Sequence, residues 1–251
     1  MNIYFVYKLV VAAEIFLAAI SFVALVFFKA PYGKFMRKGW GKTLPSRYAW
    51  IVMEAPAVLV LIAIFFLSDY TFVPILFLGI WGIHYIQRGL VYPFLIKNSK
   101  KEFPYSVVFM GMLFNLINGF VIGYFLTYIA PNYQLDWLYS WQFIFGVIIF
   151  LCGLIINLNS DYILRHLRKP GETDYKIPHG GLFERVSSPH YLGEIVEWIG
   201  FALLTWSTAG LAFAIFTFAN LAPRAIATHG WYKNNFKEYP KKRKALVPFI
   251  W

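Results

Sequence analysis

Charged residues are scarce in this sequence: Asp, Glu, Lys and Arg make up 14% of its 251 residues, whereas 59% are hydrophobic and 21% are aromatic. A soluble domain carries about 25% charged residues, so the composition argues against a soluble fold. Cysteine is scarcer still, because Cys152 stands alone and excludes an internal disulfide and a cysteine-based metal site. The Gly-x-Gly-x-x-Gly fingerprint of soluble dinucleotide-binding folds is also absent, since the pair Gly180-Gly181 lies in a loop without a strand–turn–helix context.

Long apolar runs dominate the chain instead. A helix needs about 20 residues, at about 1.5 Å each, to cross the hydrocarbon core of a bilayer. We therefore predict an all-α polytopic membrane protein, a single domain over residues 1–251 built as a bundle of seven transmembrane helices. The last two are short and joined at Trp206-Ser207-Thr208, which allows a helical hairpin. The predicted helices span 3–28, 48–67, 72–96, 105–130, 141–160, 190–206 and 207–227.

Basic residues alternate with these apolar runs. Cytoplasmic loops of membrane proteins are enriched in Lys and Arg. Every Lys and Arg except Lys8 and Arg88 lies in one of four alternate segments, which are 29–47, 97–104, 159–189 and 224–251. We predict that the N-terminus lies outside and the C-terminus in the cytosol. The net charge of +11 is therefore mainly a topology signal, and its spread over four segments argues against a nucleic-acid partner.

Polar residues are concentrated between Asn157 and Gly200, where acids, bases, His and Asn separate two apolar runs. Ionisable groups at membrane depth are costly and are functional candidates by default. At the helical rise, Glu54 lies about 9 Å and Tyr85 about 16 Å from the cytosolic side. The polar groups of the later spans fall within about two turns of a cytosolic end. We therefore predict a polar cavity that opens to the cytosol.

A polar stripe follows one face of the fifth predicted helix and continues into the loop after it, because its members are spaced by four, four and three residues. Such a stripe can follow an extended ligand that carries ribose hydroxyls and phosphates. The alternative is an internal ladder, in which Asp161 and Arg165 pair and cap the end of the helix. The stripe consists of Asn157, Asp161, Arg165 and Arg168.

The third predicted helix carries three polar residues in one turn, His84, Tyr85 and Arg88. An arginine at membrane depth needs a partner or water. Glu54, on the second predicted helix, is a candidate for that partner. In this interpretation Glu54 is a structural counter-charge and has no catalytic role.

On the sixth predicted helix, Glu194 and Glu197 follow His190 with a spacing that resembles a set of metal ligands. The helix has no second His, and arginines lie nearby to neutralise the carboxylates, so we expect no metal. Glu14 stands alone in the first apolar run, and a partner inside the bundle is the only role that the sequence suggests for it.

The chain ends in a basic and aromatic tail. Its composition is typical of an interfacial segment, with Trp231, Tyr232, Phe249 and Trp251 at the level of the lipid headgroups. In the alternative interpretation His229 and Tyr232, just past the seventh predicted helix, close over a bound ligand.

The sequence resembles the steroid 5α-reductase family. The resemblance is strongest over INLNSDYILRHLRKPGETDYKIPHGGLFERVSSPHYLGEIVEWIG and over the closing NNFKEYPKKRKALVPFIW. It continues more weakly through VMEAP at Val52–Pro56 and HYIQRGLVYP at His84–Pro93, and covers about residues 30–251. The combination of these motifs is highly specific.

The resemblance implies an integral membrane enzyme, an NADPH-dependent 3-oxo-5α-steroid 4-dehydrogenase that saturates the 4,5 double bond of 3-oxo-4-ene steroids such as testosterone or progesterone. In that family the Glu of the Glu-x-Pro segment and the Tyr of the His-Tyr segment hold the substrate ketone, and they match Glu54 and Tyr85. The cofactor-binding half would span about 141–251. The positions that the resemblance assigns to NADPH binding, or places next to it, are Arg88, Asn157, Asp161, Arg165, Arg168, Tyr175, His190, Glu194, Glu197, Arg224 and Tyr232.

Two positions depart from the family pattern on the cofactor side. His190 stands where the steroid enzymes often have Asn. A His-rich stretch before the tail tyrosine is reduced here to Thr228-His229-Gly230.

The chemistry of an enone agrees with these assignments. Addition of a hydride to the β-carbon moves negative charge to the carbonyl oxygen, and a positioned donor such as the Tyr85 hydroxyl stabilises that charge. A carboxyl group in apolar surroundings favours its protonated form, so Glu54 could donate a hydrogen bond itself or orient Tyr85.

Other activities are compatible with parts of this pattern. The nearest alternatives are membrane enone, enoyl-CoA or polyprenol reductases, followed by a methyltransferase that uses S-adenosylmethionine and by a transporter. The cytosolic bias of the polar residues and the lack of inverted repeats argue against a transporter. We expect a multi-pass protein of a bacterial inner membrane or of the endoplasmic reticulum, with its site open to the cytosol. Its expected partners are a steroid-like lipid substrate and membrane lipid, with no nucleic acid and no obligate protein partner.

Overall fold

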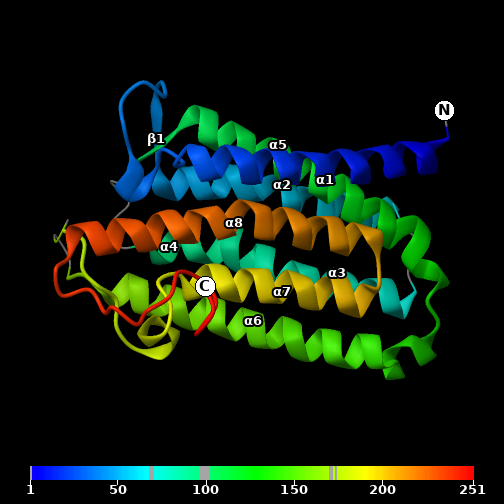
Figure 1. The fold of residues 1–251 in the computed structure, drawn as a ribbon. Coiled ribbons are helices and arrows are strands. Elements are labelled where there is room, and N and C mark those ends of the chain that lie inside the picture. Colours follow the sequence, from blue (N-terminus) through cyan, green and yellow to red (C-terminus); the bar gives the residue numbers. More distant parts are fainter. Residues whose placement is uncertain (1, 68–70, 97–101, 170–171, 173) are drawn as a thin grey trace.

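Long helices run side by side along one axis in the computed structural model (Figure 1). The structure describes residues 2–67, 71–96, 102–169, 172 and 174–251, so the predicted connections 68–71 and 97–104 are described only in part. The α-helices of the described residues are α1 (Ile3–Phe27), α2 (Ser46–Leu67), α3 (Phe72–Ile86), α4 (Tyr92–Leu95), α5 (Tyr105–Tyr124), α6 (Trp141–His166), α7 (Pro189–Thr205) and α8 (Thr208–Asn235).

Each predicted apolar range carries a helix, but several helix ends differ. The range 72–96 is divided into α3, a π-helical turn at Gln87–Val91, and α4. Helix α6 continues to His166 and α8 to Asn235, because their polar last turns remain helical where hydropathy alone predicted an end. Arg168 lies beyond the end of α6. The stripe therefore leaves the helix before its last member, which lies in the loop after α6.

The predicted hairpin at the end of the chain is confirmed. Helix α7 ends at Thr205, and Trp206 adopts a left-handed conformation with φ of 45°. The Ser207 hydroxyl then caps α8 by accepting a hydrogen bond from the Gly210 N–H at 3.0 Å. One strained residue and one cap thus reverse the chain within a single tight turn.

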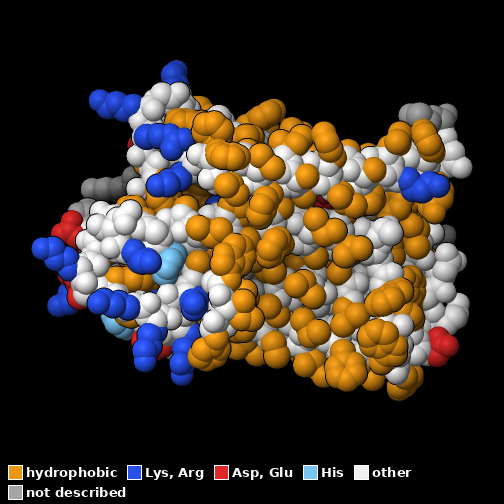
Figure 2. Space-filling view, in the orientation of Figure 1, with side chains coloured by type: hydrophobic (Ala, Val, Ile, Leu, Met, Phe, Trp, Pro, Cys, Tyr) orange, Lys and Arg blue, Asp and Glu red, His pale blue; other side chains and the backbone are white. Residues whose placement is uncertain are grey.

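Five helical stretches of the described residues are long and apolar enough to cross a membrane. Helices α3 and α7 are shorter, with 15 and 17 residues. Figure 2 shows hydrophobic side chains over most of the length of the bundle, with most of the visible Lys and Arg gathered at one end. This separation is typical of a helical membrane protein. The five stretches are Ile3–Phe27, Ser46–Ile64, Tyr105–Asn132, Trp141–His166 and Thr208–Asn235.

A small sheet qualifies the all-α prediction. Strand β1 (Thr43–Pro45) pairs antiparallel with β2 (Glu102–Pro104), with Thr43 opposite Pro104. Each strand leads directly into a long helix, β1 into α2 and β2 into α5. The pair therefore holds the starts of α2 and α5 together at the basic end of the bundle (Figure 1).

Helices α6 and α7 form the most extensive helix pair. Their backbones approach so closely that a Cβ atom on Gly153 would meet the backbone of Glu197, and one on Gly193 would meet the backbone of Asn157. Small residues permit such approach in membrane helices. The close contact fixes the polar end of α6 against the polar end of α7.

The tail folds back onto the bundle. Val186 and Lys244 form a β-bridge, and the Leu246 side chain packs against Ile195 and Leu221. Tyr232 is only 5% exposed, which argues against the interfacial interpretation for this residue. Its helix continues past the predicted end and carries the ring inward.

Candidate active site

One large cavity, with a volume of about 1110 Å³, lies within the described part of the bundle. Pockets for a single small ligand measure about 300–1,000 Å³, so this cavity lies just above that range. Its wall includes every predicted site residue except Asn157, Glu197 and His229. The predicted residues in the wall are Glu54, Tyr85, Arg88, Asp161, Arg165, Arg168, Tyr175, His190, Glu194, Arg224 and Tyr232.

The wall of the cavity changes character along the bundle. On α8 it passes from Phe213 and Phe216 to Arg224, eleven residues after Phe213 and therefore about 16 Å farther along the helix. The aromatic part of the wall is completed by α2, α5 and α7. Its apolar members are Met53, Val107, Met110, Phe114, Trp198, Phe213 and Phe216. A flat apolar ligand fits this inner part, and a charged ligand fits the other.

Three arginines form the charged part of the cavity. Arg165 Nη1, Arg168 Nη1 and Arg224 Nε are buried and have no hydrogen-bond partner among the described residues. Arg224 Nη1 donates to the Tyr32 hydroxyl at 2.7 Å, which fixes the direction of the guanidinium group. Buried donors without partners are costly, and phosphate oxygens would satisfy them. The donor set thus fits the phosphates of a nicotinamide dinucleotide.

The loop after α6 covers the charged part from the side. Burial raises the pKa of the Tyr175 hydroxyl, while the nearby Arg168 acts in the opposite direction. The Arg168 guanidinium lies 5.3 Å from the centre of the Tyr175 ring. A hydrogen bond from Lys176 lowers the pKa of Glu172, helped by the Lys169 N–H at 2.9 Å. At neutral pH this wall therefore presents a neutral phenol and an ionised, paired carboxylate.

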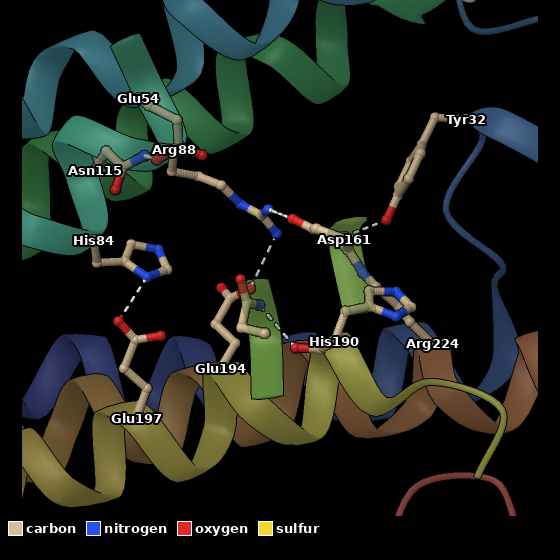
Figure 3. Close-up of polar contacts among 11 residues, drawn as sticks. Tyr32, Glu54, His84, Arg88, Asn115, Asp161, His190, Glu194, Glu197 and Arg224 are labelled. Atoms are coloured by element: carbon tan, nitrogen blue, oxygen red, sulfur yellow. Dashed lines mark hydrogen bonds and ion pairs between the residues drawn. The ribbon is translucent and has the colours of Figure 1, made fainter. Parts of the chain in front are cut away.

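Arg88 joins three helical segments at the middle of the cavity. Its guanidinium donates to Asp161 Oδ2 at 2.5 Å and to Glu194 Oε2 at 3.3 Å, as Figure 3 shows. Asp161 thus pairs with Arg88, which is distant in sequence, and not with Arg165 on its own helix. Within the part of the chain that the structure describes, the acidic partners of Arg88 are Asp161 and Glu194, and Glu54 does not form an ion pair with it. Arg88 lies in the π-helical turn, a distortion that often marks functional positions.

The three residues that resembled metal ligands separate in the structure. Glu197 Oε1 lies 3.0 Å from His84 Nδ1, whereas Glu194 pairs with Arg88 (Figure 3). The carbonyl of His190 accepts from Asn157 Nδ2 at 2.9 Å, and His190 Nδ1 has no partner among the described residues. Asn157 thus lies behind the cavity wall and positions His190. The metal-ligand interpretation lacks the geometry it needs.

An asparagine that the sequence analysis missed connects the two predicted catalytic residues. Asn115 Nδ2 donates to Glu54 Oε2 at 3.1 Å, and the Tyr85 hydroxyl donates to Asn115 Oδ1 at 3.2 Å. Asn118 Nδ2 donates to the Tyr85 oxygen at 3.3 Å. Two asparagines three residues apart in an apolar helix are a signal that could have identified them. Glu54 and Tyr85 therefore belong to one hydrogen-bonded group.

Close helix packing puts Glu54 into this group. A Cβ atom on Gly89 would lie 3.1 Å from Glu54 Cβ, so a glycine lets the π-helical turn approach α2. Asn115 Nδ2 also donates to the Met53 carbonyl at 2.7 Å. The turn of α2 that carries Glu54 is thus fixed to α5 where the carboxyl group enters the cavity.

The last turns of α8 close the other end. Tyr232 lines the cavity and stacks on Tyr239, with ring centres 5.3 Å apart. His229 Nδ1 lies 2.6 Å from the Ser187 hydroxyl, which also lies 2.6 Å from the Tyr239 hydroxyl. Ser187 lines the cavity and His229 does not. His229 therefore holds the wall and the tail together instead of closing over the cavity itself.

Comparison with known proteins identifies the family. A family model described as 3-oxo-5-alpha-steroid 4-dehydrogenase matches residues 101–251. Steroid 5-alpha-reductase DET2 of Gossypium hirsutum is 43% identical over 237 residues, which cover 92% of each chain. 3-oxo-5-alpha-steroid 4-dehydrogenase 1 of Mus musculus is 42% identical and covers 94% of each chain, and 3-oxo-5-alpha-steroid 4-dehydrogenase 2 of Sus scrofa is 43% identical and covers 96%. The chain belongs to the family of steroid 5α-reductases, the 3-oxo-5α-steroid 4-dehydrogenases.

Proposed function

We propose that the protein reduces the 4,5 double bond of 3-oxo-4-ene steroids with NADPH and forms 5α-steroids. One observation carries the proposal: a single cavity joins an aromatic inner part, where Glu54 and Tyr85 share Asn115, to an outer part with unpartnered arginine donors. The first part suits a flat ketone and the second suits phosphates. The names of the relatives, which describe steroid reductases, support the same substrate class.

Glu54 and Tyr85 would hold the ketone oxygen of the substrate. Negative charge develops on that oxygen during the reaction, and donors fixed before the reaction stabilise it without having to reorganise. Asn115 accepts from the Tyr85 hydroxyl and Asn118 donates to it, so the phenol oxygen is held from two sides, and its single O–H would turn from Asn115 to the ketone oxygen when the steroid binds. Glu54 is held by Asn115 and would stay protonated among apolar neighbours, which gives the oxygen a second donor.

When bound, NADPH supplies the hydride that adds to the β-carbon of the enone, and the α-carbon takes up a proton to complete the saturated ketone. Arg165, Arg168 and Arg224 would bind its phosphates. Tyr175, Glu194 and Tyr232, together with Asp161 and Arg88, would line the nucleoside and nicotinamide parts. His190 would contact the cofactor directly, and Asn157 would act through its bond to the His190 carbonyl. The half of the chain over residues 141–251 would thus be the cofactor-binding half.

In the same proposal the chain crosses the membrane seven times. Helix α3 reaches a crossing length together with the π-helical turn and α4, and α7 crosses within its hairpin with α8. The gathering of Lys and Arg at one end of the bundle supports a cytosolic position for that end and for the C-terminus. The cavity would open there to NADPH, and the steroid would enter from the bilayer. Neither a nucleic acid nor an obligate protein partner is needed.

Reduction by the purified protein in lipid bilayers tests the proposal. Testosterone and progesterone are incubated with the protein and with NADPH or NADH, and the products are separated and analysed by mass spectrometry. We expect 5α-products that are heavier by two hydrogens, with NADPH preferred. Reduction of an enoyl-CoA or a polyprenol from the same panel, with every steroid unchanged, would overturn the substrate class.

A further inference from the structure

Glu14 is the one acidic residue in the first long helix, and the proposed mechanism does not use it. It is 0% exposed, and neither of its carboxyl oxygens has a partner among the residues that the structure describes. It lies outside the lining of the large cavity. The partner inside the bundle that the sequence suggested is therefore missing. A buried polar group without a hydrogen-bond partner is energetically costly, and its presence needs a structural or functional reason.

The depth of Glu14 follows from its helix. Tyr7 and Tyr124 stack with ring centres 4.8 Å apart, so the start of α1 lies against the end of α5. The two helices run in opposite directions (Figure 1). Glu14 is seven residues after Tyr7, about 10 Å along α1, and Asn118 is six residues before Tyr124, about 9 Å the same way along α5. Glu14 and Asn118 therefore lie at the same depth.

Asn118 has a buried acceptor that lacks a donor within the described ranges. It is 0% exposed, and its Oδ1 atom has no partner in the described parts of the chain. Its Nδ2 atom donates to the Tyr85 oxygen at 3.3 Å. Glu14 is also close enough to Tyr85 to interact with it electrostatically. An acceptor without a donor and an acid without a partner thus lie near Tyr85 at the same depth of the bundle.

Burial determines the protonation state of Glu14, and with it the hydrogen bonds that this side chain can make. An unpaired carboxylate in an apolar interior is strongly unfavourable, and such a group takes up a proton instead. The protonated carboxyl group has one O–H donor, which is what Asn118 Oδ1 lacks. A buried water molecule can also bridge two such groups.

We propose that Glu14 is a positioning residue of the reductase site. Its protonated carboxyl group donates to Asn118 Oδ1, directly or through one buried water, and thereby fixes the amide that holds the Tyr85 hydroxyl. The inference rests on the proposed function, because it gives Glu14 its effect through the group that would bind the ketone.

Three variants test it in kinetics. Glu14→Leu removes the donor, and Glu14→Gln keeps a donor in a side chain of similar shape. Tyr7→Phe is the control, because it removes another buried hydroxyl from the same face of α1. That hydroxyl lies 3.1 Å from the Thr208 hydroxyl. We expect Glu14→Leu to lower kcat about tenfold or more, with the KM values for steroid and NADPH within about twofold. Glu14→Gln should restore most of the turnover, and Tyr7→Phe should leave kcat unchanged. Unchanged kcat in Glu14→Leu would overturn the proposal.

An infrared measurement decides the matter even if Glu14→Leu does not fold. The protonated Glu54 would contribute one carboxylic-acid carbonyl stretch, and a second such stretch, from Glu14, should disappear in Glu14→Gln and should shift in Asn118→Leu. A band that Asn118→Leu leaves in place would overturn the contact. If the wild type reduces no steroid while the band still responds to Asn118→Leu, the proposed function fails and the contact stands.

Discussion

Replacing Asn115 by leucine should separate the binding of the ketone from the binding of the cofactor. The leucine has a similar volume but removes three hydrogen bonds, to Glu54, to Tyr85 and to the Met53 carbonyl. Removing one donor from an oxyanion-type site costs about 2.7–4 kcal/mol in the transition state. Asn115 positions the groups that donate to the ketone and does not itself touch it, so we expect about 2–3 kcal/mol, which is a loss of about 30- to 150-fold in kcat/KM for the steroid.

The affinity for NADPH should not change in this variant, because Arg165, Arg168 and Arg224 lie in the other part of the cavity. The free energy of unfolding should fall by about 1–3 kcal/mol, since the Met53 carbonyl and the Glu54 carboxyl lose a buried donor. Asn132→Leu, in an exposed turn, serves as the matched control. Steady-state kinetics, NADPH titration and thermal unfolding measure the three quantities. Wild-type kcat/KM in Asn115→Leu would refute the assignment of the ketone site, whatever the stability.

Three further substitutions test other parts of the account. Glu54→Gln should preserve folding and NADPH binding but lower kcat strongly, and an unchanged kcat would remove Glu54 from the site. Arg168→Ala should raise the Kd for NADPH about tenfold or more, because a charged hydrogen bond contributes about 1.5–3 kcal/mol; equal affinity in a titration would show that Arg168 does not bind phosphate. Gly153→Ala should lower the free energy of unfolding by about 1–3 kcal/mol, since its Cβ would meet the backbone of Glu197. A denaturant titration that shows wild-type stability would mean that α6 and α7 pack less closely than described.

Much of the fold could be predicted from the sequence because the bilayer leaves few choices. An apolar run must form a helix in lipid, since its backbone groups have no other partners there, and each of the seven predicted ranges carries one. The hairpin at Trp206 could be predicted because three polar or aromatic residues separate two apolar runs. The π-helical turn at Gln87–Val91 could not, because it depends on how closely α2 approaches Gly89.

The composition of the site could be predicted better than its contacts. Arg165 and Arg168 line the cavity as expected from their position after the fifth apolar run. The partner of Asp161 could not be predicted, because spacing along one helix suggests Arg165 and only tertiary structure brings Arg88 within 2.5 Å. The pair Asn115 and Asn118 in an apolar helix could have marked Asn115 as a candidate, but its partners Glu54 and Tyr85 could not be predicted, since nothing in the sequence states that α5 packs against α2.

Transfer of a labelled hydride tests the central claim most directly. The purified protein is given NADPH that carries deuterium in the transferable position on the nicotinamide ring, together with a 3-oxo-4-ene steroid, and the product is analysed by mass spectrometry and NMR. The account predicts one deuterium at the β-carbon of the former enone and a 5α-product. A steroid that is recovered unreduced, or a product that carries no deuterium from the cofactor, would contradict it.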